Sequence, residues 1–308
     1  MQKSSILIFL SFLLVASWLV QGLAIYFVGD LSSARAAPWL VSLMFFPTLA
    51  AIIYRLGFNS NAFAHVRFWP GNPLYLILGA LIPAATTLAV LAIVENAGWG
   101  SCDYFGFSVA GAELKKGPWV LGLGTQSWWM FALNIAATAI AYALVNSIAA
   151  VGEEFAWRGF LQKPMMDNFG MIGGVALLGL VWAYWHLPAN LAGYNYPHSP
   201  VLGGLVLFPA LLLADSFIMA WLTIRAKSFW PAVLMHGSGN GIQEGILGRI
   251  TLAEGMPRLW IDFTTLAVAA VLGVVCTVAL MRKREPQCAA FVIEGPGESS
   301  SALGKEEV

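Results

Sequence analysis

A series of long apolar runs constrains this chain more than any other feature. Of its 308 residues, 59% are hydrophobic and 10% are charged, whereas a soluble globular domain has about 25% charged residues. A membrane-spanning helix needs about 20 mostly apolar residues. The sequence therefore predicts an all-α membrane protein with about eight transmembrane helices, at 5–28, 38–56, 73–95, 140–162, 171–188, 201–224, 229–247 and 261–281.

Residues 1–284 are predicted to form one polytopic membrane domain without an internal repeat, and residues 285–308 a disordered cytoplasmic tail. The tail is rich in Gly, Ser, Pro and Glu and has no apolar period. At the other end, the apolar run 6–28 is longer than the 7–15 residues of a signal-peptide core. We therefore expect a first membrane helix there, with a cleaved signal as the alternative.

The segment 127–162 is too long for one straight crossing at about 1.5 Å per residue. Its first part contains Trp128 and Trp129, and tryptophan is enriched at membrane interfaces. This part is therefore expected to lie at the interface. The preceding segment, 96–126, is predicted to be a loop that is long enough to be translocated whatever its lysines.

Basic residues in the loops predict the orientation, because positive loops stay on the cytoplasmic side. With the N-terminus inside, the chain has five basic residues on the outer side and nine on the cytoplasmic side. The cytoplasmic set is Lys3, Arg55, Arg67, Lys163, Arg225, Lys227, Arg282, Lys283 and Arg284. The outer set is Arg35, Lys115, Lys116, Arg249 and Arg258. Both termini are therefore expected in the cytoplasm.

Two classes of site are not supported by composition. The formal net charge is zero, so no electrostatic footprint for nucleic acid is present. The three cysteines, at 102, 276 and 288, are far apart and form no CxxC pair, which gives no thiolate metal site. The lipid bilayer is the partner that composition predicts.

Three charges interrupt the apolar pattern in the stretch AVGEEFAWRGF, residues 150–160. Burying one charge in a membrane helix costs at least about 2.5–3.5 kcal/mol, so such a residue is a candidate functional residue. Glu154 and Arg158 are four residues apart and can pair on one helix face. Glu153 points about 100° away and is left free to face another partner.

Polar residues of other predicted helices reach a similar depth. At about 1.5 Å per residue, Glu153, His186, His236 and Asn240 lie about 10–22 Å from the cytoplasmic helix ends. A water molecule between Glu153 and the histidines could be deprotonated by Glu153, while His236 and Asn240 donate to an oxyanion. Asp215 has a similar depth and could orient a histidine or form a plain interhelical hydrogen bond.

Each feature alone has a structural interpretation. Glu154 and Arg158 could form a structural ion pair, and His186 could be a core histidine. His236 and Asn240 could be a helix–helix hydrogen-bonding pair, worth about 0.6 kcal/mol. Their convergence at one depth favours a polar intramembrane catalytic cavity.

The stretch GEEFAWRGFLQ resembles the EExxxR motif of the CPBP family of intramembrane proteases, which includes the CAAX prenyl endopeptidases and the bacterial abortive-infection class. WAYWHLPAN and SFWPAVLMHGSGN resemble its second and last motifs, so the resemblance covers residues 140–245. It implies that Glu153 is the catalytic base and that His186, His236 and Asn240 bind the water and the oxyanion. Glu154 and Arg158 would be the supporting pair.

The second motif of this family usually has Phe where this chain has Trp182, and little consequence is expected because both are aromatic. The resemblance leaves the use of a metal open. No cofactor is the leading interpretation, and a zinc ion on Glu153, His186 and His236 is the alternative.

The predicted function is an intramembrane endopeptidase that hydrolyses a membrane-associated, prenylated or otherwise hydrophobic peptide. It would reside in a bacterial or archaeal plasma membrane as a multi-pass protein. One alternative is a non-catalytic immunity or scaffold protein of the same family. Another is a proton-coupled transporter using the same buried groups, although the inverted repeats typical of that class are not found.

Overall fold

Helices account for most of the chain in the computed structural model, which describes residues 1–117 and 119–282. The predicted tail, 285–308, lies outside the described residues. Within them, six helical segments are long and apolar enough to cross a membrane. They are α1 (Lys3–Val28), α2 and α3 (Ala37–Met44 and Phe46–Gly57), α4 (Pro73–Asn96), α5, η1 and α6 (Trp128–Glu154, Phe155–Leu161 and Gln162–Phe169), α9, η2 and α10 (Pro200–Leu202, Gly203–Leu207 and Phe208–Ala226), and α13 (Leu259–Arg282).

The chain is thus a multi-pass, mostly helical membrane protein, but the expected count of eight is not confirmed. The predicted helices 171–188 and 229–247 are shorter or broken in the structure. Their pieces are α7 (Met171–Trp185), α8 (Leu187–Leu191), α11 (Trp230–Ser238), the π-helix η3 (Gly239–Gln243) and α12 (Glu244–Leu247). The predicted helix 38–56 is also broken, at Phe45, where α3 restarts with Pro47 in its first turn.

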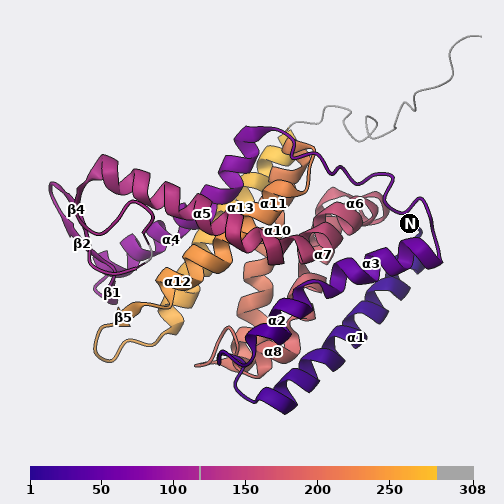
Figure 1. Cartoon of the computed structure of the whole chain (residues 1–308), viewed down its shortest axis with the longest axis horizontal. Helices are drawn as coiled ribbons and strands as arrows, with labels where there is room; N and C mark the ends of the chain where they lie inside the picture. The colour runs from indigo at the N-terminus through magenta and orange to yellow at the C-terminus, as the bar shows by residue number, and fades with distance from the viewer. Residues whose placement is uncertain (118, 283–308) are drawn as a thin grey trace, which may run out of the picture.

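Residues 128–162 lie in one continuous helical segment, in which α5, η1 and α6 run from Trp128 to Phe169. This segment begins before the predicted helix 140–162, and the interfacial location expected for Trp128 and Trp129 stays a prediction. No proline interrupts the backbone hydrogen bonds between Trp128 and Gln162. The Ser127 side chain also caps the first turn by accepting a hydrogen bond from the Met130 N–H. In Figure 1 the N-terminal half of α5 runs toward β2 and β4, and its buried residues pack against those of α4.

The predicted loop 96–126 contains strands that the hydropathy pattern did not indicate. A three-stranded antiparallel sheet joins β2 (Phe105–Ser108), β3 (Gly111–Leu114) and β4 (Gly124–Ser127) at the start of α5. A second pair joins β1 (Gly100–Cys102) to β5 (Ile250–Leu252), with Ser101 opposite Thr251. This pair ties the end of α4 to the segment before α13 (Figure 1).

The loops gather at two opposite ends of the bundle. At the N-terminal end, Asn168 donates to the Met1 carbonyl, and the Ser228 hydroxyl donates to the Trp69 carbonyl. At the other end lie the turn after α1, the two small sheets and the loop 192–199. Seven of the nine basic residues predicted to be cytoplasmic lie within the described residues, and the orientation itself stays a prediction.

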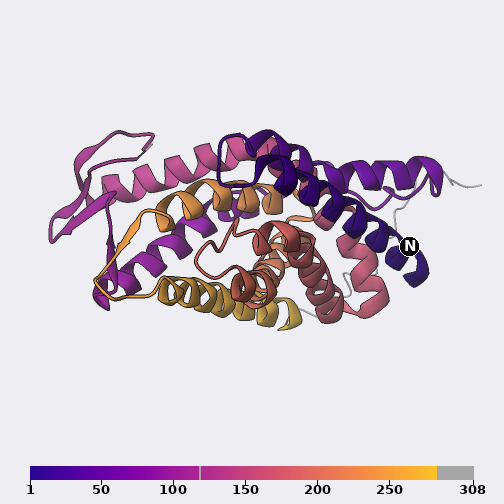
Figure 2. The same cartoon turned by 90° about the horizontal axis from the view of Figure 1, so that it is seen from below.

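The bundle is closely packed where α11 lies between α4 and α5 (Figure 2). A Cβ atom on Gly79 of α4 would lie 2.4 Å from the Pro231 carbonyl oxygen of α11. One on Gly237 of α11 would lie 2.8 Å from the Ala143 carbonyl oxygen of α5. Only glycine permits such approach of two backbones, as is common between membrane helices. These contacts hold α11, which carries His236, directly against the helix that carries Glu153.

Candidate active site

The two adjacent glutamates occur where α5 changes into the π-helix η1. Glu153 and Glu154 are the last residues of α5, and both are buried, with 1% and 0% of their surface exposed. π-Turns are rare and occur often at functional sites. The two side chains leave the helix in different directions and take different partners, as their spacing predicts.

Glu154 forms the predicted buried pair with Arg158. One guanidinium nitrogen, Nη1, donates to both carboxylate oxygens at 2.9 Å, while Nη2 donates to the Ser216 hydroxyl at 3.0 Å. The pairing is therefore confirmed, but only one nitrogen of the guanidinium is used for the carboxylate. The same carboxylate lies 2.9 Å from Nδ1 of His236. Glu154 thus joins Arg158 to one of the predicted histidines.

Glu153 faces away from that pair and bonds to Trp182. The indole Nε1–H donates to Oε2 of Glu153 at 2.8 Å. Among the described residues, no side chain hydrogen bonds to Oε1, so this oxygen keeps its lone pairs for a molecule in the cavity. The expectation that Trp182 matters little in place of Phe is wrong, because a phenyl ring cannot donate this hydrogen bond.

Trp182 stands at the centre of the site. The Arg158 guanidinium carbon lies 4.0 Å from the centroid of its ring, within the range of a cation–π interaction. The rings of His186 and His236 lie 6.2 Å and 5.6 Å from it, centroid to centroid. One indole therefore contacts the charged pair, Glu153 and both histidines.

The two histidines are oriented by different partners. Nδ1 of His186 lies 2.9 Å from the Trp182 carbonyl oxygen, which can only accept, so the proton is on Nδ1. Nδ1 of His236 donates to the Glu154 carboxylate by the same reasoning. In both rings Nε2 is the nitrogen left to interact with a ligand. His186 is bonded to a neutral group and His236 to an anion.

A cavity of about 600 Å³ brings most of the predicted residues together. Its volume is typical of a small-molecule or peptide site. Glu153, Trp182, His186, His236 and Asn240 all line it. Asn240 is in η3, one turn beyond His236, and is exposed to the cavity. Glu154 and Arg158 do not line the cavity and lie behind Glu153.

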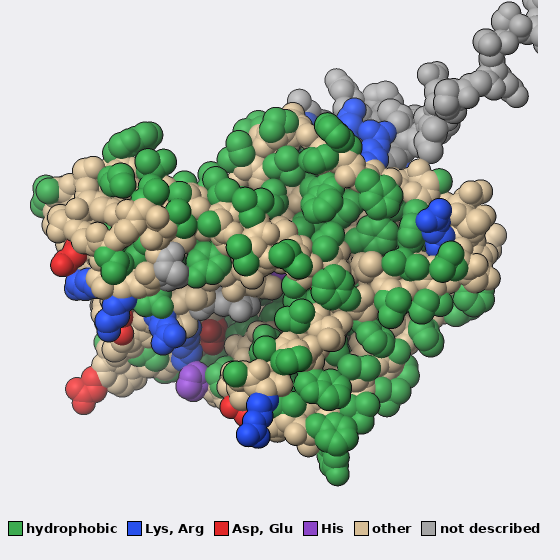
Figure 3. Space-filling model, in the orientation of Figure 1, with side chains coloured by type: hydrophobic (Ala, Val, Ile, Leu, Met, Phe, Trp, Pro, Cys, Tyr) green, Lys and Arg blue, Asp and Glu red, His purple; other side chains and the backbone are tan. Residues whose placement is uncertain are grey.

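The cavity extends to loop residues after α8 and before α13, among them Tyr194 and Gly248. A smaller hollow of about 250 Å³ adjoins it and shares Tyr196, Arg258 and Asp262 with it. Burial raises the pKa of the Tyr196 phenol, so this group stays protonated at neutral pH and can donate a hydrogen bond. Figure 3 shows Lys, Arg and His side chains around a hollow on this face, with an acidic side chain inside it.

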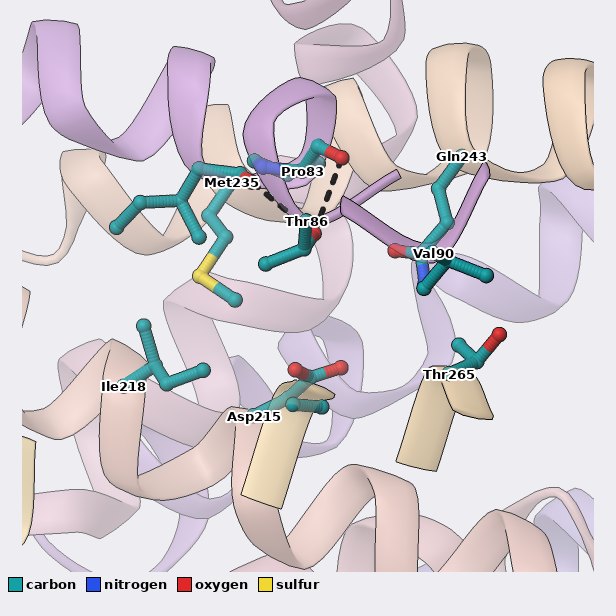
Figure 4. A pocket seen from close by; sticks show the side chains of 10 residues that line it. Pro83, Thr86, Val90, Asp215, Ile218, Met235, Gln243 and Thr265 are labelled. Atoms are coloured by element: carbon teal, nitrogen blue, oxygen red, sulfur yellow. Dashed lines mark hydrogen bonds between the residues drawn. The ribbon is translucent and has the colours of Figure 1, made fainter. Parts of the chain in front are cut away.

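Asp215 is not brought into hydrogen-bond contact with either histidine within the described residues. It lines the main cavity, and its carboxylate also points into a pocket of about 20 Å³, opposite Met235 and Thr86 (Figure 4). That volume is about the size of one water molecule. The predicted orienting role for Asp215 is therefore not seen.

The residue before the two glutamates is held by a helix distant in sequence. The Thr48 hydroxyl of α3 donates to the Gly152 carbonyl oxygen at 2.6 Å. A Cβ atom on Gly152 would lie 2.7 Å from the Met44 carbonyl oxygen. The junction between α2 and α3 thus packs directly against the backbone that carries Glu153.

A zinc site, structural or catalytic, takes at least three protein ligands within about 2.0–2.3 Å of the metal. Among the described residues, no three His, Cys, Asp or Glu side chains converge closely enough to hold an ion. The alternative set of Glu153, His186 and His236 lines one cavity without forming such a cluster.

Three contributors to the site were missed by sequence reasoning. Trp182 was expected only as an aromatic residue, and Ser216, which accepts from Arg158, carried no signal. Gln21 of α1 also lines the cavity and is 2% exposed. An amide in an otherwise apolar helix is the signal that could have identified Gln21.

Comparison with known proteins agrees with the motifs. Residues 123–242 match the model of a family described as type II CAAX prenyl endopeptidase Rce1-like. CAAX prenyl protease 2 of Methanococcus maripaludis is 26% identical over 102 residues, which cover 32% of this chain. The match spans 37% of that relative. All seven predicted site residues lie within the range that matches the family model.

Proposed function

We propose that this chain, whose residues 123–242 belong to the Rce1-like family of type II CAAX prenyl endopeptidases, is an intramembrane endopeptidase. One observation carries the proposal above the others. A buried carboxylate, Glu153, lines a cavity of about 600 Å³ together with two histidines whose Nδ1 atoms are already bonded. A purely structural ion pair such as Glu154 with Arg158 would need neither the cavity nor the histidines.

The first step is the activation of water. Oε1 of Glu153 is a carboxylate oxygen and accepts hydrogen bonds. Nε2 of His186 is also an acceptor, because Nδ1 of this ring holds the proton. A water molecule that donates one hydrogen to each would direct its oxygen toward a peptide carbonyl. Glu153 takes the proton as the water attacks, in the role of general base. The Trp182 N–H donates to Oε2 and so holds the Glu153 side chain in place for this transfer.

The second step is the stabilisation of the oxyanion. A neutral His236 presents a lone pair at Nε2, so it donates only as the imidazolium. The Glu154 carboxylate at Nδ1 favours that charged form. His236 and the amide of Asn240 then donate to the tetrahedral oxyanion, which such groups stabilise by a few kcal/mol.

The third step completes the hydrolysis. The tetrahedral intermediate collapses, the C–N bond breaks, and Glu153 returns the proton to the leaving amine. This step gives a carboxylic acid at the new C-terminus and an amine at the new N-terminus. The acid then loses its proton and the amine gains one, so the products are a carboxylate and an ammonium, which together account for the water consumed. These steps use only side chains named above, and among the described residues no three His, Cys, Asp or Glu side chains form a ligand cluster.

The substrate class follows from the cavity wall and the relatives. Leu40, Leu43 and Met44 line one side, and Phe208 and Leu211 line another. These apolar walls would accept a hydrophobic peptide or a prenyl chain entering from the bilayer. We therefore propose a prenylated peptide as the substrate, in line with the activity named for the relatives.

The proposal is tested with purified protein and an S-farnesyl peptide that ends in Cys-Val-Ile-Ala. We expect release of Val-Ile-Ala, detected by mass spectrometry, at a rate that EDTA or 1,10-phenanthroline does not change. Loss of activity with chelator, restored by zinc, would overturn the metal-free mechanism but keep the peptidase. No cleavage of this peptide or of a farnesyl-free analogue would contradict the proposed function itself.

We also propose that the termini face the cytoplasm, from the nine-to-five distribution of basic residues. Ser60 and Ser101 are both exposed and lie at opposite ends of the bundle. In a chain with Cys288→Ser, a membrane-impermeant maleimide added to intact cells should label Ser101→Cys and leave Ser60→Cys unlabelled. The reverse pattern would invert the orientation.

A further inference from the structure

The helix that carries His186 is broken directly after it. α7 ends at Trp185, α8 begins at Leu187, and His186 lies between them. In a continuous helix the N–H groups of residues 188 and 189 would donate to the carbonyls of Tyr184 and Trp185. Residue 188 is proline and has no N–H. The break therefore leaves buried backbone groups in need of other partners.

Side chains of α1 supply those partners. The Trp18 indole N–H donates to the Tyr184 carbonyl at 2.9 Å. Gln21 Nε2 donates to the Trp185 carbonyl at 2.7 Å, and Gln21 Oε1 accepts from the Ala189 N–H at 3.1 Å. The Gln21 amide thus takes the place of the missing backbone bond, by bonding both the carbonyl and the N–H on either side of His186.

This arrangement determines where the His186 ring can point. Nδ1 is bonded to the Trp182 carbonyl, one turn earlier on α7, and the Trp185 ring packs edge-on at 4.6 Å between centroids. The direction of Nε2 therefore depends on the backbone torsions at the break. Gln21, which is 2% exposed, constrains those torsions through its hydrogen bonds to the backbone on both sides of the break.

We propose that Gln21 is a positioning residue for the reaction: its amide closes the break between α7 and α8 and fixes the direction in which His186 presents Nε2. The inference rests on the proposed function, since it assigns His186 the task of orienting water. It also extends the catalytic machinery to α1, which lies outside the range that matches the family model.

Two substitutions separate positioning from simple stability. Gln21→Met keeps the side-chain size and removes both hydrogen bonds. It should lower kcat on the S-farnesyl peptide by about 10- to 100-fold, the scale expected when a catalytic group is displaced by about 1 Å. KM should stay within about twofold, because the substrate-binding walls of the cavity are unchanged.

Gln21→Glu should give a pH-dependent enzyme. A protonated carboxyl group donates and accepts as the amide does, so activity should approach that of the wild type at acidic pH. An ionised carboxylate would place an oxygen anion against the Trp185 carbonyl. Activity should therefore fall as pH rises, in a range where the wild-type enzyme shows no such loss.

Gln126→Met is the matched control. Gln126 is also a buried amide that bridges two groups: it donates to the Gly122 carbonyl and accepts from Asn134. It lies on β4, outside the cavity. This control should lower the melting temperature without lowering kcat. If Gln21→Met keeps its kcat, or if Gln21→Glu has the wild-type pH profile, the positioning role is wrong.

A readout without substrate keeps this inference separate from the proposed function. With ¹⁵N-labelled histidine, the ring signals of His186 are assigned by their loss in His186→Asn. They should shift in Gln21→Met, while those of His198 stay unchanged. Shifted signals in a protein that cleaves no peptide would contradict the proposed function alone. An active wild type with unshifted His186 signals in Gln21→Met would contradict the inference.

Discussion

Glu153→Gln is expected to lower kcat by about 10²–10⁴-fold, the usual contribution of a general base. Glutamine has nearly the same shape and can still accept from the Trp182 N–H, but it cannot take a proton from water. The folded state should be nearly unaffected. The measurement is kcat on the S-farnesyl peptide together with the melting temperature of the purified protein in detergent.

Glu113→Gln is the control for the chemical change. Glu113 is exposed on β3, in the sheet at the start of α5, and its substitution should leave kcat within about twofold, as is usual for a surface change away from the site. Full activity in Glu153→Gln would eliminate the proposed mechanism. If activity fell only as far as the amount of folded protein fell, the scaffold interpretation of the polar cluster would be favoured.

Arg158→Met is expected to produce the largest loss of stability. It removes the cation from a carboxylate that is 0% exposed, and breaking a buried pair in this way costs about 3–5 kcal/mol. The loss also includes the contact of the guanidinium with the Trp182 ring. The free energy of unfolding should be measured by denaturant titration in mixed micelles.

Lys163→Met provides a matched comparison a few residues further along the same helical segment. Lys163 and Asp167 are also four residues apart, and at 2.7 Å their contact is shorter than that of Glu154 and Arg158. Their side chains are 30% and 55% exposed, however, so this loss should be about 0–1 kcal/mol. Adding Glu154→Gln to Arg158→Met should recover part of the stability. Equal losses for the two single variants would contradict the argument from burial.

Sequence reasoning succeeded where the interactions are local. The pairing of Glu154 with Arg158 follows from helix geometry over four residues, and the structure contains it. The grouping of the loops at two ends follows from counting apolar runs. The breaks in the helices were harder to predict. Short helices such as α7 and α11 are stabilised by packing against neighbouring helices, so they need not be about 20 residues long.

The remaining features depend on contacts between distant parts of the chain. Gln21 meets Trp185 across 164 positions, and Trp182 meets Glu153 across 29. No helical or strand period links such residues. The strands of three or four residues in 100–127 are also too short to show a clear alternation of apolar and polar residues. The sequence shows that residue 21 is polar, but it does not show that this side chain bonds to the Trp185 carbonyl.

The two histidines lie on parts of the backbone that are packed with different tightness. His236 is on α11, whose backbone touches those of α4 and α5 through Gly79 and Gly237, so no side chain can rotate to loosen it. His186 is at a helix break that side chains of α1 bridge. If the cavity widens to admit a substrate, the His186 wall should yield first. Glu153 and His236 would then stay in place, and the side of the cavity that carries His186 would move toward them when the cavity closes.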